Sequence, residues 1–331
     1  MLKDFLATRG ATFDERGRPE SFTSPHSEFA ALETALVVPL LGHTALRVIG
    51  ADRLDFVHGQ LSNEVKRLQV GTFSENLLLN HKGHALAQMR VFLREDDLFL
   101  AVEGNAGELV ERELKTHIIF DQVELQTLSE TITSFTVQGL QAAKVLESFG
   151  GLPTANTFIQ VPFANAKILI HAAKRTVPGG FDIHVLSRDA ESLLIRLLES
   201  GATLAGEQAL EMSRVEAGIP YAQTEAGEGV LPQEAGLEHC ISYTKGCYLG
   251  QEIMARIEAR GNLRRSLKKV RLEALPSPED RDIRASDKIV GKLGKVVQHP
   301  TLGVIALAVL RNDLPSDAVL HVGNIRLSLR D

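Results

Sequence analysis

The first half of the chain changes repeatedly between the two-residue hydrophobic period of strands and the longer period of helices. Leu54, Val57 and Leu61, for example, have helical spacing, whereas Ala85, Ala87 and Met89 recur at every second position. The elements that these patterns predict, in chain order, are a strand at 44–50, a helix at 51–61, strands at 73–80, 85–93 and 98–102, a helix at 109–118 and a strand at 123–128.

A similar order of elements follows. The predicted elements are a strand at 134–139, a helix at 140–149, strands at 166–172 and 181–186, and a leucine-rich helix from Asp189. We interpret the recurrence as an α+β duplication, in which each half is a split βαβ arrangement of the ferredoxin-like kind. The alternative is the ordinary alternation of helices and strands that any α/β chain shows.

From Arg264 onward the pattern changes to short apolar runs separated by glycines, with little helical period. Such a segment is typical of a small closed β-barrel, in which closure removes exposed strand edges. We therefore expect two interleaved α+β lobes in residues 1–262 and a β-barrel in residues 263–331.

Composition narrows the class of protein. Of 331 residues, 44% are hydrophobic and 24% are charged, which is ordinary for a globular protein. A net charge of −6 gives no electrostatic reason to expect binding to nucleic acid or to a membrane surface. Two cysteines fit a reducing compartment, and neither a signal peptide nor a membrane-spanning stretch is apparent. We expect a soluble, cytoplasmic protein.

One of the two cysteines lies in the motif K-G-C-Y-L-G-Q-E, residues 245–252, directly before a predicted helix. The helix N-terminus and Lys245 are both expected to favour the thiolate of Cys247. Three interpretations stay open: a reactive thiol, a ligand to a labile or shared iron–sulfur cluster, or a buried packing residue. Cys240 is expected to be packing, and the spacing of the two cysteines does not predict a closed zinc site.

A second motif, R-V-E-A-G-I-P, places Arg214 and Glu216 at the end of a predicted helix that Gly218 and Pro220 terminate. A carboxylate in this position is able to accept two parallel hydrogen bonds from an amino-pyrimidinone edge such as that of a pterin. The alternative is a pair of ordinary surface charges.

Together these segments resemble the YgfZ-type folate-binding proteins, which are relatives of the glycine-cleavage T-protein. The cysteine motif resembles the signature of the YgfZ branch, and R-V-E-A-G-I-P resembles the helix end whose glutamate holds the pterin in the T-protein. L-P-Q-E-A-G-L, residues 231–237, is similar to a shared element, and the likeness extends over residues 30–331. The resemblance implies a three-lobed ring with tetrahydrofolate near its centre, and a role in making or repairing iron–sulfur proteins, including a radical tRNA-modifying enzyme.

One segment departs from the T-protein pattern. Where the T-protein carries an acidic pair that assists methylene transfer, this chain has Ala87 and Gln88. Neither side chain ionises, which argues against aminomethyl transfer. His81 and His84 flank the same glycine and are either substitutes for the missing acid or ordinary polar positions on a strand.

We therefore expect a tetrahydrofolate-binding accessory factor that acts with iron–sulfur proteins or their assembly machinery. The alternatives are a folate-dependent aminomethyltransferase and a scaffold with a vestigial folate pocket. Tyr221 or Tyr248 would offer a stacking face, and Arg256 and Lys245 are candidate cations for the folate tail. The candidate site residues are Cys247 and Lys245 as catalytic groups, and Glu216, Arg214, Tyr221, Tyr248, Gln251 and Arg256 as cofactor-binding groups.

Overall fold

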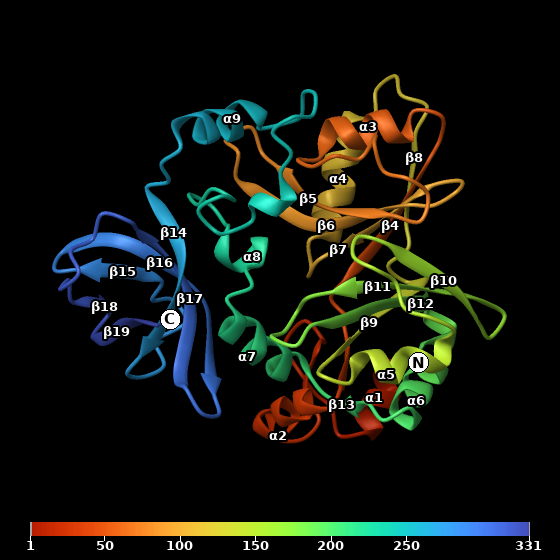
Figure 1. Ribbon diagram of the computed structural model, residues 1–331, viewed down its shortest axis with the longest axis horizontal. Helices are drawn as coiled ribbons and strands as arrows, with labels where there is room; N and C mark the ends of the chain where they lie inside the picture. The colour runs from red at the N-terminus through yellow and green to blue at the C-terminus, as the bar shows by residue number, and fades with distance from the viewer. Residues whose placement is uncertain (1, 331) are drawn as a thin grey trace. The chain divides into compact units, whose positions relative to one another are not determined.

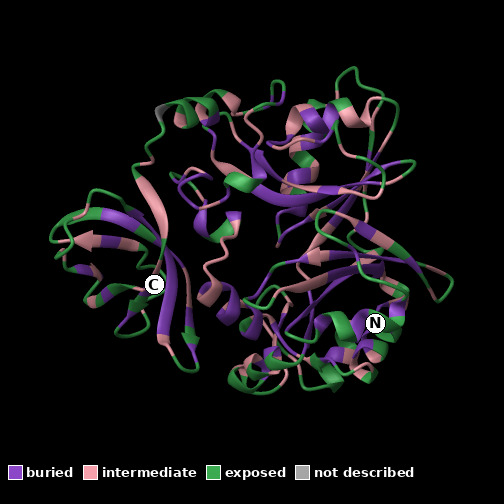
Figure 2. Cartoon of the chain, in the orientation of Figure 1, coloured by how far each residue is buried: buried purple, intermediate pink, exposed green. Residues whose placement is uncertain are grey.

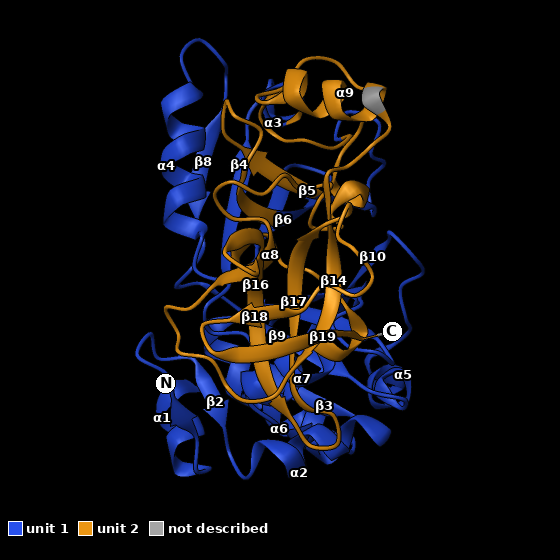
Figure 3. Cartoon of the chain, turned by 90° about the vertical axis from the view of Figure 1, so that its left-hand side faces the viewer, with its two compact units in different colours: residues 1–57, 65–75, 89–213 blue, residues 58–64, 76–88, 214–331 orange. Residues whose placement is uncertain are grey.

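The computed structural model describes residues 2–330 as two compact units (Figures 1 and 3). Unit 1 contains residues 1–57, 65–75 and 89–213, and unit 2 contains residues 58–64, 76–88 and 214–331. The chain therefore passes between the units several times, and β5 (Phe73–Leu79) and β6 (Ala85–Leu93) each contribute residues to both. Among residues 2–330, no helix combines the length and the apolar composition needed to cross a lipid bilayer.

The chain begins with short elements that the hydrophobic pattern did not predict. These are α1 (Leu2–Thr8), β1 (Thr12–Phe13), β2 (Pro19–Ser21), α2 (Pro25–Ala30) and β3 (Leu36–Pro39). Ser24 caps α2 by accepting a hydrogen bond from the backbone N–H of Ser27 at 3.1 Å, and Pro25 occupies the first helical turn. β3 is buried along its whole length and joins the second of the two large sheets.

The two large sheets have the same internal plan. In the first, the element order is strand, helix, three strands, helix and strand, and the strands lie in the order β5-β6-β7-β4-β8. Its remaining elements are β4 (Thr44–Ile49), α3 (Arg53–Gln60), β7 (Leu98–Val102), α4 (Gly107–His117) and β8 (Glu124–Thr127).

The second sheet repeats that plan, with the strand order β10-β11-β12-β9-β3-β13. Each strand occupies the place of its counterpart in the first sheet, and β3 is inserted before the last strand. The elements are β9 (Ile132–Gln138), α5 (Ala142–Leu146), β10 (Phe158–Phe163), β11 (Ala166–Ala173), β12 (Gly180–Leu186), α6 (Ala190–Glu199) and β13 (Thr203–Leu204). The matching orders confirm the predicted duplicated α+β arrangement.

The second sheet has an apolar face and a polar face. On the apolar face, α1, α5 and α6 cover alternate residues of β3, β9, β11 and β12, such as Val137, Ile170 and Ile183 (Figure 1). Alternate residues on the same strands, including Ser134, His171 and Asp182, point to the opposite face. There a cluster of aromatic and aliphatic side chains joins the two sheets within unit 1: Ala45, Phe73, Phe92, Phe99, Phe158 and Leu169.

Unit 2 contains the predicted β-barrel, which runs from Arg265 to Arg330 and closes through pairing of β14 with β19. Its strand order is β14-β17-β16-β15-β18-β19, and β17 is buried along most of its length (Figure 2). The strands are β14 (Arg265–Leu272), β15 (Asp282–Ala285), β16 (Lys288–His299), β17 (Gly303–Arg311), β18 (Leu320–Val322) and β19 (Ile325–Arg330).

Three helices lead into the barrel, and they carry the two motifs found in the sequence. α7 (Glu207–Ala217) ends with the R-V-E motif, α8 (Ala222–Glu225) follows it closely, and α9 (Gln251–Arg260) begins within the cysteine motif. Gly261 ends α9 in the left-handed conformation, as its position in the sequence predicted.

Candidate functional site

The cysteine motif is fixed at its first residue, Lys245. The Nζ atom of Lys245 donates hydrogen bonds to the backbone oxygens of His58, of Leu61 at 2.6 Å and of Asn63 at 3.0 Å. These contacts use all three N–H bonds of the ammonium group. Burial lowers the pKa of Lys245 to about 8, so the group remains protonated at neutral pH. Lys245 thus anchors the motif to residues 58–63 within unit 2.

Two glycines bring the cysteine motif against the turn at residues 80–84. Gly83 and Gly250 both have positive φ, at +75° and +85°. A Cβ on Gly83 would lie 2.7 Å from Cε of Met254, and one on Gly250 would lie 2.9 Å from the backbone oxygen of Asn80. Since only glycine avoids both the strain and the overlap, the two positions set the start of α9 against this turn.

The thiol of Cys247 lies at the surface. Cys247 is exposed and, within residues 2–330, its sulfur forms no hydrogen bond, whereas Cys240 is completely buried in an apolar cluster with Leu237 and Met254. The interpretation of Cys247 as a buried packing residue is therefore wrong, and that of Cys240 as packing is confirmed. The accessible sulfur is available to a reactant or a partner.

The other residues of the motif differ in exposure. Tyr248 is buried, its ring centroid lies 4.8 Å from Nζ of Lys245, and burial raises the pKa of its hydroxyl to about 12. The side chain of Gln251 donates to the backbone oxygen of Lys245 at 3.4 Å, and Arg256 is exposed. Tyr248 and Gln251 therefore pack against or bind other residues of the loop before α9, while Cys247 and Arg256 face solvent.

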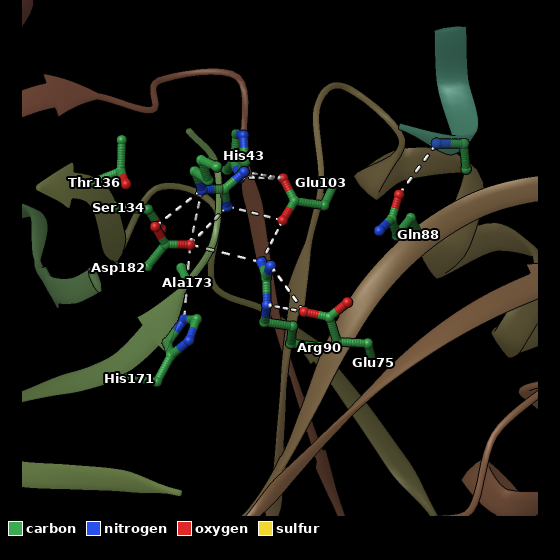
Figure 4. Close-up of polar contacts among 12 residues, drawn as sticks. His43, Glu75, Gln88, Arg90, Glu103, Ser134, Thr136, His171, Ala173 and Asp182 are labelled. Carbon is green, nitrogen blue, oxygen red and sulfur yellow. Dashed lines mark hydrogen bonds and ion pairs between the residues drawn. The ribbon is translucent and has the colours of Figure 1, made fainter. Parts of the chain in front are cut away.

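The segment that replaces the acidic pair has a structural function in unit 2. Ala87 and Gln88 are buried, and Oε1 of Gln88 accepts a hydrogen bond from the backbone N–H of Ala222 at 3.1 Å (Figure 4). That N–H belongs to the first residue of α8, so the amide oxygen satisfies a donor that the helix leaves open. His81 is exposed and His84 is half-buried.

Arg214 is buried inside the turn that follows α7. Its Nη1 atom donates to the backbone oxygen of Ile219 at 2.6 Å and to Glu225 at 3.0 Å, and both side chains of this ion pair are fully buried. The guanidinium carbon lies 4.4 Å from the ring centroid of Tyr221. One face of the Tyr221 ring is thus covered by Arg214, and in this conformation Arg214 supports the turn.

Glu216, two residues further along, is held at the surface by barrel residues. Its Oε2 lies 3.5 Å from Nε2 of His299, and its backbone oxygen accepts a hydrogen bond from Nη2 of Arg330 at 2.9 Å. Nδ1 of His299 accepts from the backbone N–H groups of Thr301 at 3.3 Å and Leu302 at 3.2 Å. Because Nδ1 is an acceptor, Nε2 carries the proton of a neutral imidazole, and this N–H lies near the carboxylate without forming a hydrogen bond within residues 2–330.

Arg330 has unused hydrogen-bonding capacity beside Glu216. Its Nε and Nη1 atoms are buried and have no hydrogen-bond partner within residues 2–330. Buried polar atoms of this kind are costly unless a water molecule or a ligand satisfies them. The side chain of Glu216 remains one-third exposed. Together they form an anion and a cation that both retain capacity for a polar ligand.

The sequence-predicted residues thus fall into two groups in unit 2. Lys245, Cys247, Tyr248 and Gln251 belong to the loop before α9, while Arg214, Glu216 and Tyr221 surround the end of α7. Cys247 and Glu216 do not contact each other. His299 and Arg330 were not found by sequence reasoning, because they lie on barrel strands and no local motif marks them.

A buried ionic cluster between the sheets of unit 1 also has strongly perturbed titration (Figure 4). Arg175 binds both oxygens of Asp182, at 2.9 and 2.6 Å, and both oxygens of Glu103, at 2.9 and 2.8 Å. Arg90 bridges Glu103 and Glu75, at 2.5 and 3.0 Å. Burial opposes ionisation of Glu103 and Asp182, but the two arginines outweigh it and hold the pKa of both carboxyls well below the usual range.

The histidines beside this cluster are neutral. Burial lowers the pKa of His43 and of His171 to about 4. His171 donates from Nδ1 to the backbone oxygen of Ala172 at 3.0 Å, so its Nε2 accepts from Nε2 of His184 at 3.3 Å, and Nδ1 of His184 accepts from Ser134 at 2.8 Å. The neutral histidines satisfy one another's hydrogen bonds without adding a charge. The ionic cluster with these histidines is best explained as a structural link between the two sheets of unit 1.

Comparison with solved structures identifies the fold, and a family model identifies the family. The fold matches the crystal structure of glycine cleavage system aminomethyltransferase T from Bartonella henselae, with a TM-score of 0.87 over 100% of this chain and 96% of that one, at 18% identity. The family model described as the GCVT N-terminal domain matches residues 6–245, and the chain belongs to this family.

Relatives from two differently named groups match most of the chain. The aminomethyltransferase of Exiguobacterium sibiricum is 25% identical over 97% of this chain and 91% of its own length. The tRNA-modifying protein YgfZ of Edwardsiella ictaluri is 29% identical over 90% of this chain and 92% of its own length. Several relatives carry the YgfZ name, which confirms the resemblance found in the sequence.

Proposed function

We propose that this protein binds tetrahydrofolate and acts as an accessory factor for iron–sulfur enzymes, among them a radical tRNA-modifying enzyme. The observation that carries the proposal is the partly exposed carboxylate of Glu216 beside the unpartnered Nε and Nη1 atoms of Arg330. A pterin offers an amino-pyrimidinone edge to a carboxylate and one carbonyl oxygen to a guanidinium. The donors and acceptors of these two side chains therefore fit the cofactor.

Tetrahydrofolate, when bound, supplies a carrier for one-carbon units and a reduced ring. Glu216 and Arg330 would hold it, His299 would lie beside Glu216, and the ring of Tyr221 would offer a stacking face. Cys247 would provide an accessible thiol for a partner or for a cluster in transit. The relatives named tRNA-modifying protein YgfZ support the link to tRNA modification.

Calorimetric titration with tetrahydrofolate tests the cofactor proposal. We expect Glu216→Gln to weaken binding by about 1.5–3 kcal/mol, which is the range for one charged hydrogen-bond partner. Glu273→Gln, a change at an exposed barrel residue of unit 2, serves as the matched control and is expected to bind as the wild type does. Equal affinity in the wild type and in Glu216→Gln would place the pterin elsewhere.

The accessory role is tested separately in cells that lack their own YgfZ-type protein. We expect the wild type to restore activity of an iron–sulfur tRNA-modifying enzyme and Cys247→Ala to fail, although the variant folds normally because the side chain is exposed. Restoration by Cys247→Ala would refute the role of the thiol while leaving folate binding intact.

A second function, folate-dependent aminomethyl transfer, is favoured by the relatives named aminomethyltransferase. The buried amide of Gln88 argues against it, because its oxygen accepts from the N–H of Ala222 and the group does not exchange a proton. Turnover with an aminomethylated lipoyl carrier protein and tetrahydrofolate distinguishes the two functions, and measurable ammonia release would favour the transferase.

A further inference from the structure

The end of the β-barrel contains a cavity of about 400 Å³ that lies apart from the residues considered above. Its lining comes from β14, β17, β18, β19 and the loop between β17 and β18. All of these segments belong to unit 2. Mouths of small barrels are recurrent positions for ligand sites, because the interior-facing side chains end there and leave a concave surface.

The strand register places part of the lining, including Lys268, on the inner side of the barrel. On β14, Val270 and Leu272 belong to the barrel core, and Leu267 packs against a different cluster outside it. Since successive side chains of a strand point to opposite sides, Lys268 continues the inner row of Val270 and Leu272. Leu310 ends the inner row of β17 in the same cavity, and on β19 Leu329 continues the row of Leu327 there.

The mouth combines aliphatic side chains with the cations Lys268, Arg311 and Arg326 and with a few neutral polar residues. Val319 and Leu329 line the cavity and are 56% and 60% exposed, although large aliphatic side chains are normally covered. Lys268 is exposed and forms no ion pair or side-chain hydrogen bond within residues 2–330. Arg311 also lines the cavity, but its guanidinium binds Asp313 at 2.6 Å. No aspartate or glutamate among the described residues contributes to the lining.

We propose that this mouth is a binding site for a small amphiphilic anion, an alkyl chain with a carboxylate or phosphate head group. The chain would cover Val319, Leu329 and the end of the core, and the head group would pair with the ammonium of Lys268. Neither the alkyl chain nor the head group is expected to bind well alone, because an exposed lysine binds a free anion weakly and a cavity of this size buries only a short chain.

The test is calorimetric titration of the full chain with octyl phosphate and with octanoate, both below their micelle concentrations. Octanol and inorganic phosphate supply the chain and the head group separately. We expect saturable one-to-one binding of at least one of the two anions, and binding at least about tenfold weaker for octanol and for inorganic phosphate. The stronger of the two anions identifies the head group.

Two variants locate the site. Lys268→Gln is expected to weaken binding of the anion about five- to tenfold, and Leu329→Ser to weaken it by a similar factor. Lys288→Gln, at an exposed lysine of β16 outside the cavity, is the matched control. Glu216→Gln should bind the anion as the wild type does, which separates this site from the folate proposal. Absence of saturable heat up to millimolar ligand, or unchanged binding by Lys268→Gln, would overturn the proposal.

Discussion

Replacement of Arg175 by methionine would remove the central cation of the ionic cluster in unit 1. Methionine has comparable length and an apolar side chain, so the change tests charge and hydrogen bonding more than volume. Arg175 is almost completely buried and binds both oxygens of Asp182 and both oxygens of Glu103 (Figure 4). Its loss leaves two buried carboxylates with Arg90 as the remaining arginine partner that they share.

The expected loss of unfolding free energy follows from that charge count. In the wild type, Arg90 and Arg175 share the carboxylates of Glu103, Asp182 and the partly exposed Glu75, and Arg175→Met leaves Arg90 as their remaining arginine. Removing one partner from a buried ion pair costs about 3–5 kcal/mol. Arg90 still contacts both carboxylates, at 2.5 and 3.6 Å, so we expect a value near the lower end of this range.

The assay is urea unfolding followed by far-ultraviolet circular dichroism. Arg188→Met is the matched control, since Arg188 is exposed in the same unit and lies 3.5 Å from Asp189. Its expected effect is below about 0.5 kcal/mol. Arg175 lowers the pKa of both carboxyls in the wild type, so without it burial raises the pKa of the carboxyl that Arg90 does not satisfy. Protonation of this carboxyl removes the uncompensated buried charge from the variant. The difference in unfolding free energy between the wild type and Arg175→Met should therefore become smaller as the pH is lowered from 7.5 to 5. An effect as small as that of Arg188→Met would refute the reasoning.

Three further predictions concern pH, Lys245 and the two thiols. His43 and His171 have a pKa of about 4 in the folded protein and about 6.5 in the unfolded chain, so the unfolded chain binds more protons between these values. The unfolding free energy should therefore fall as the pH drops from about 6.5 towards 4, and a free energy from urea titrations that does not change over this range would contradict the prediction. Lys245→Met leaves backbone oxygens of residues 58–63 without their donor and should cost about 2–4 kcal/mol in thermal unfolding, whereas an unchanged melting temperature would remove the anchoring role. A thiol reagent should titrate one cysteine, Cys247, in the native protein and a second, Cys240, only after unfolding.

The sequence predicted the elements with a clear period and missed those without one. β10 contains Pro162, which removes a backbone donor and normally argues against a strand. The structure tolerates it because β10 is the edge strand of its sheet. β3 is buried along its whole length, so its residues show no alternation from which a strand could be inferred. With β10 and the two-residue β13 unrecognised, the second half of the duplication was incomplete in the sequence, and β3, which is inserted in that sheet, was missed as well.

Site prediction succeeded where one local segment carries the chemistry. The cysteine motif predicted a helix start after Cys247, and α9 begins at Gln251, where Gly250 meets the turn at residues 80–84. The interaction partner of the lysine charge was harder to predict. Lys245 lies two residues from Cys247 in the sequence, but its ammonium group binds backbone oxygens. A sequence motif shows which chemical groups are present, but the hydrogen-bond partner of each group depends on residues that folding brings close.

The surroundings of Glu216 depend on residues that are distant in the sequence. Backbone N–H groups of Thr301 and Leu302 fix which nitrogen of His299 carries the proton, and that choice presents an N–H to the carboxylate of Glu216. If the tautomer were reversed, a lone pair would face the carboxylate and repel it. The turn after β16 therefore sets which nitrogen of His299 carries the proton beside the carboxylate at the end of α7. No spacing in the sequence contains this relation, because the barrel strands are brought to α7 only by folding.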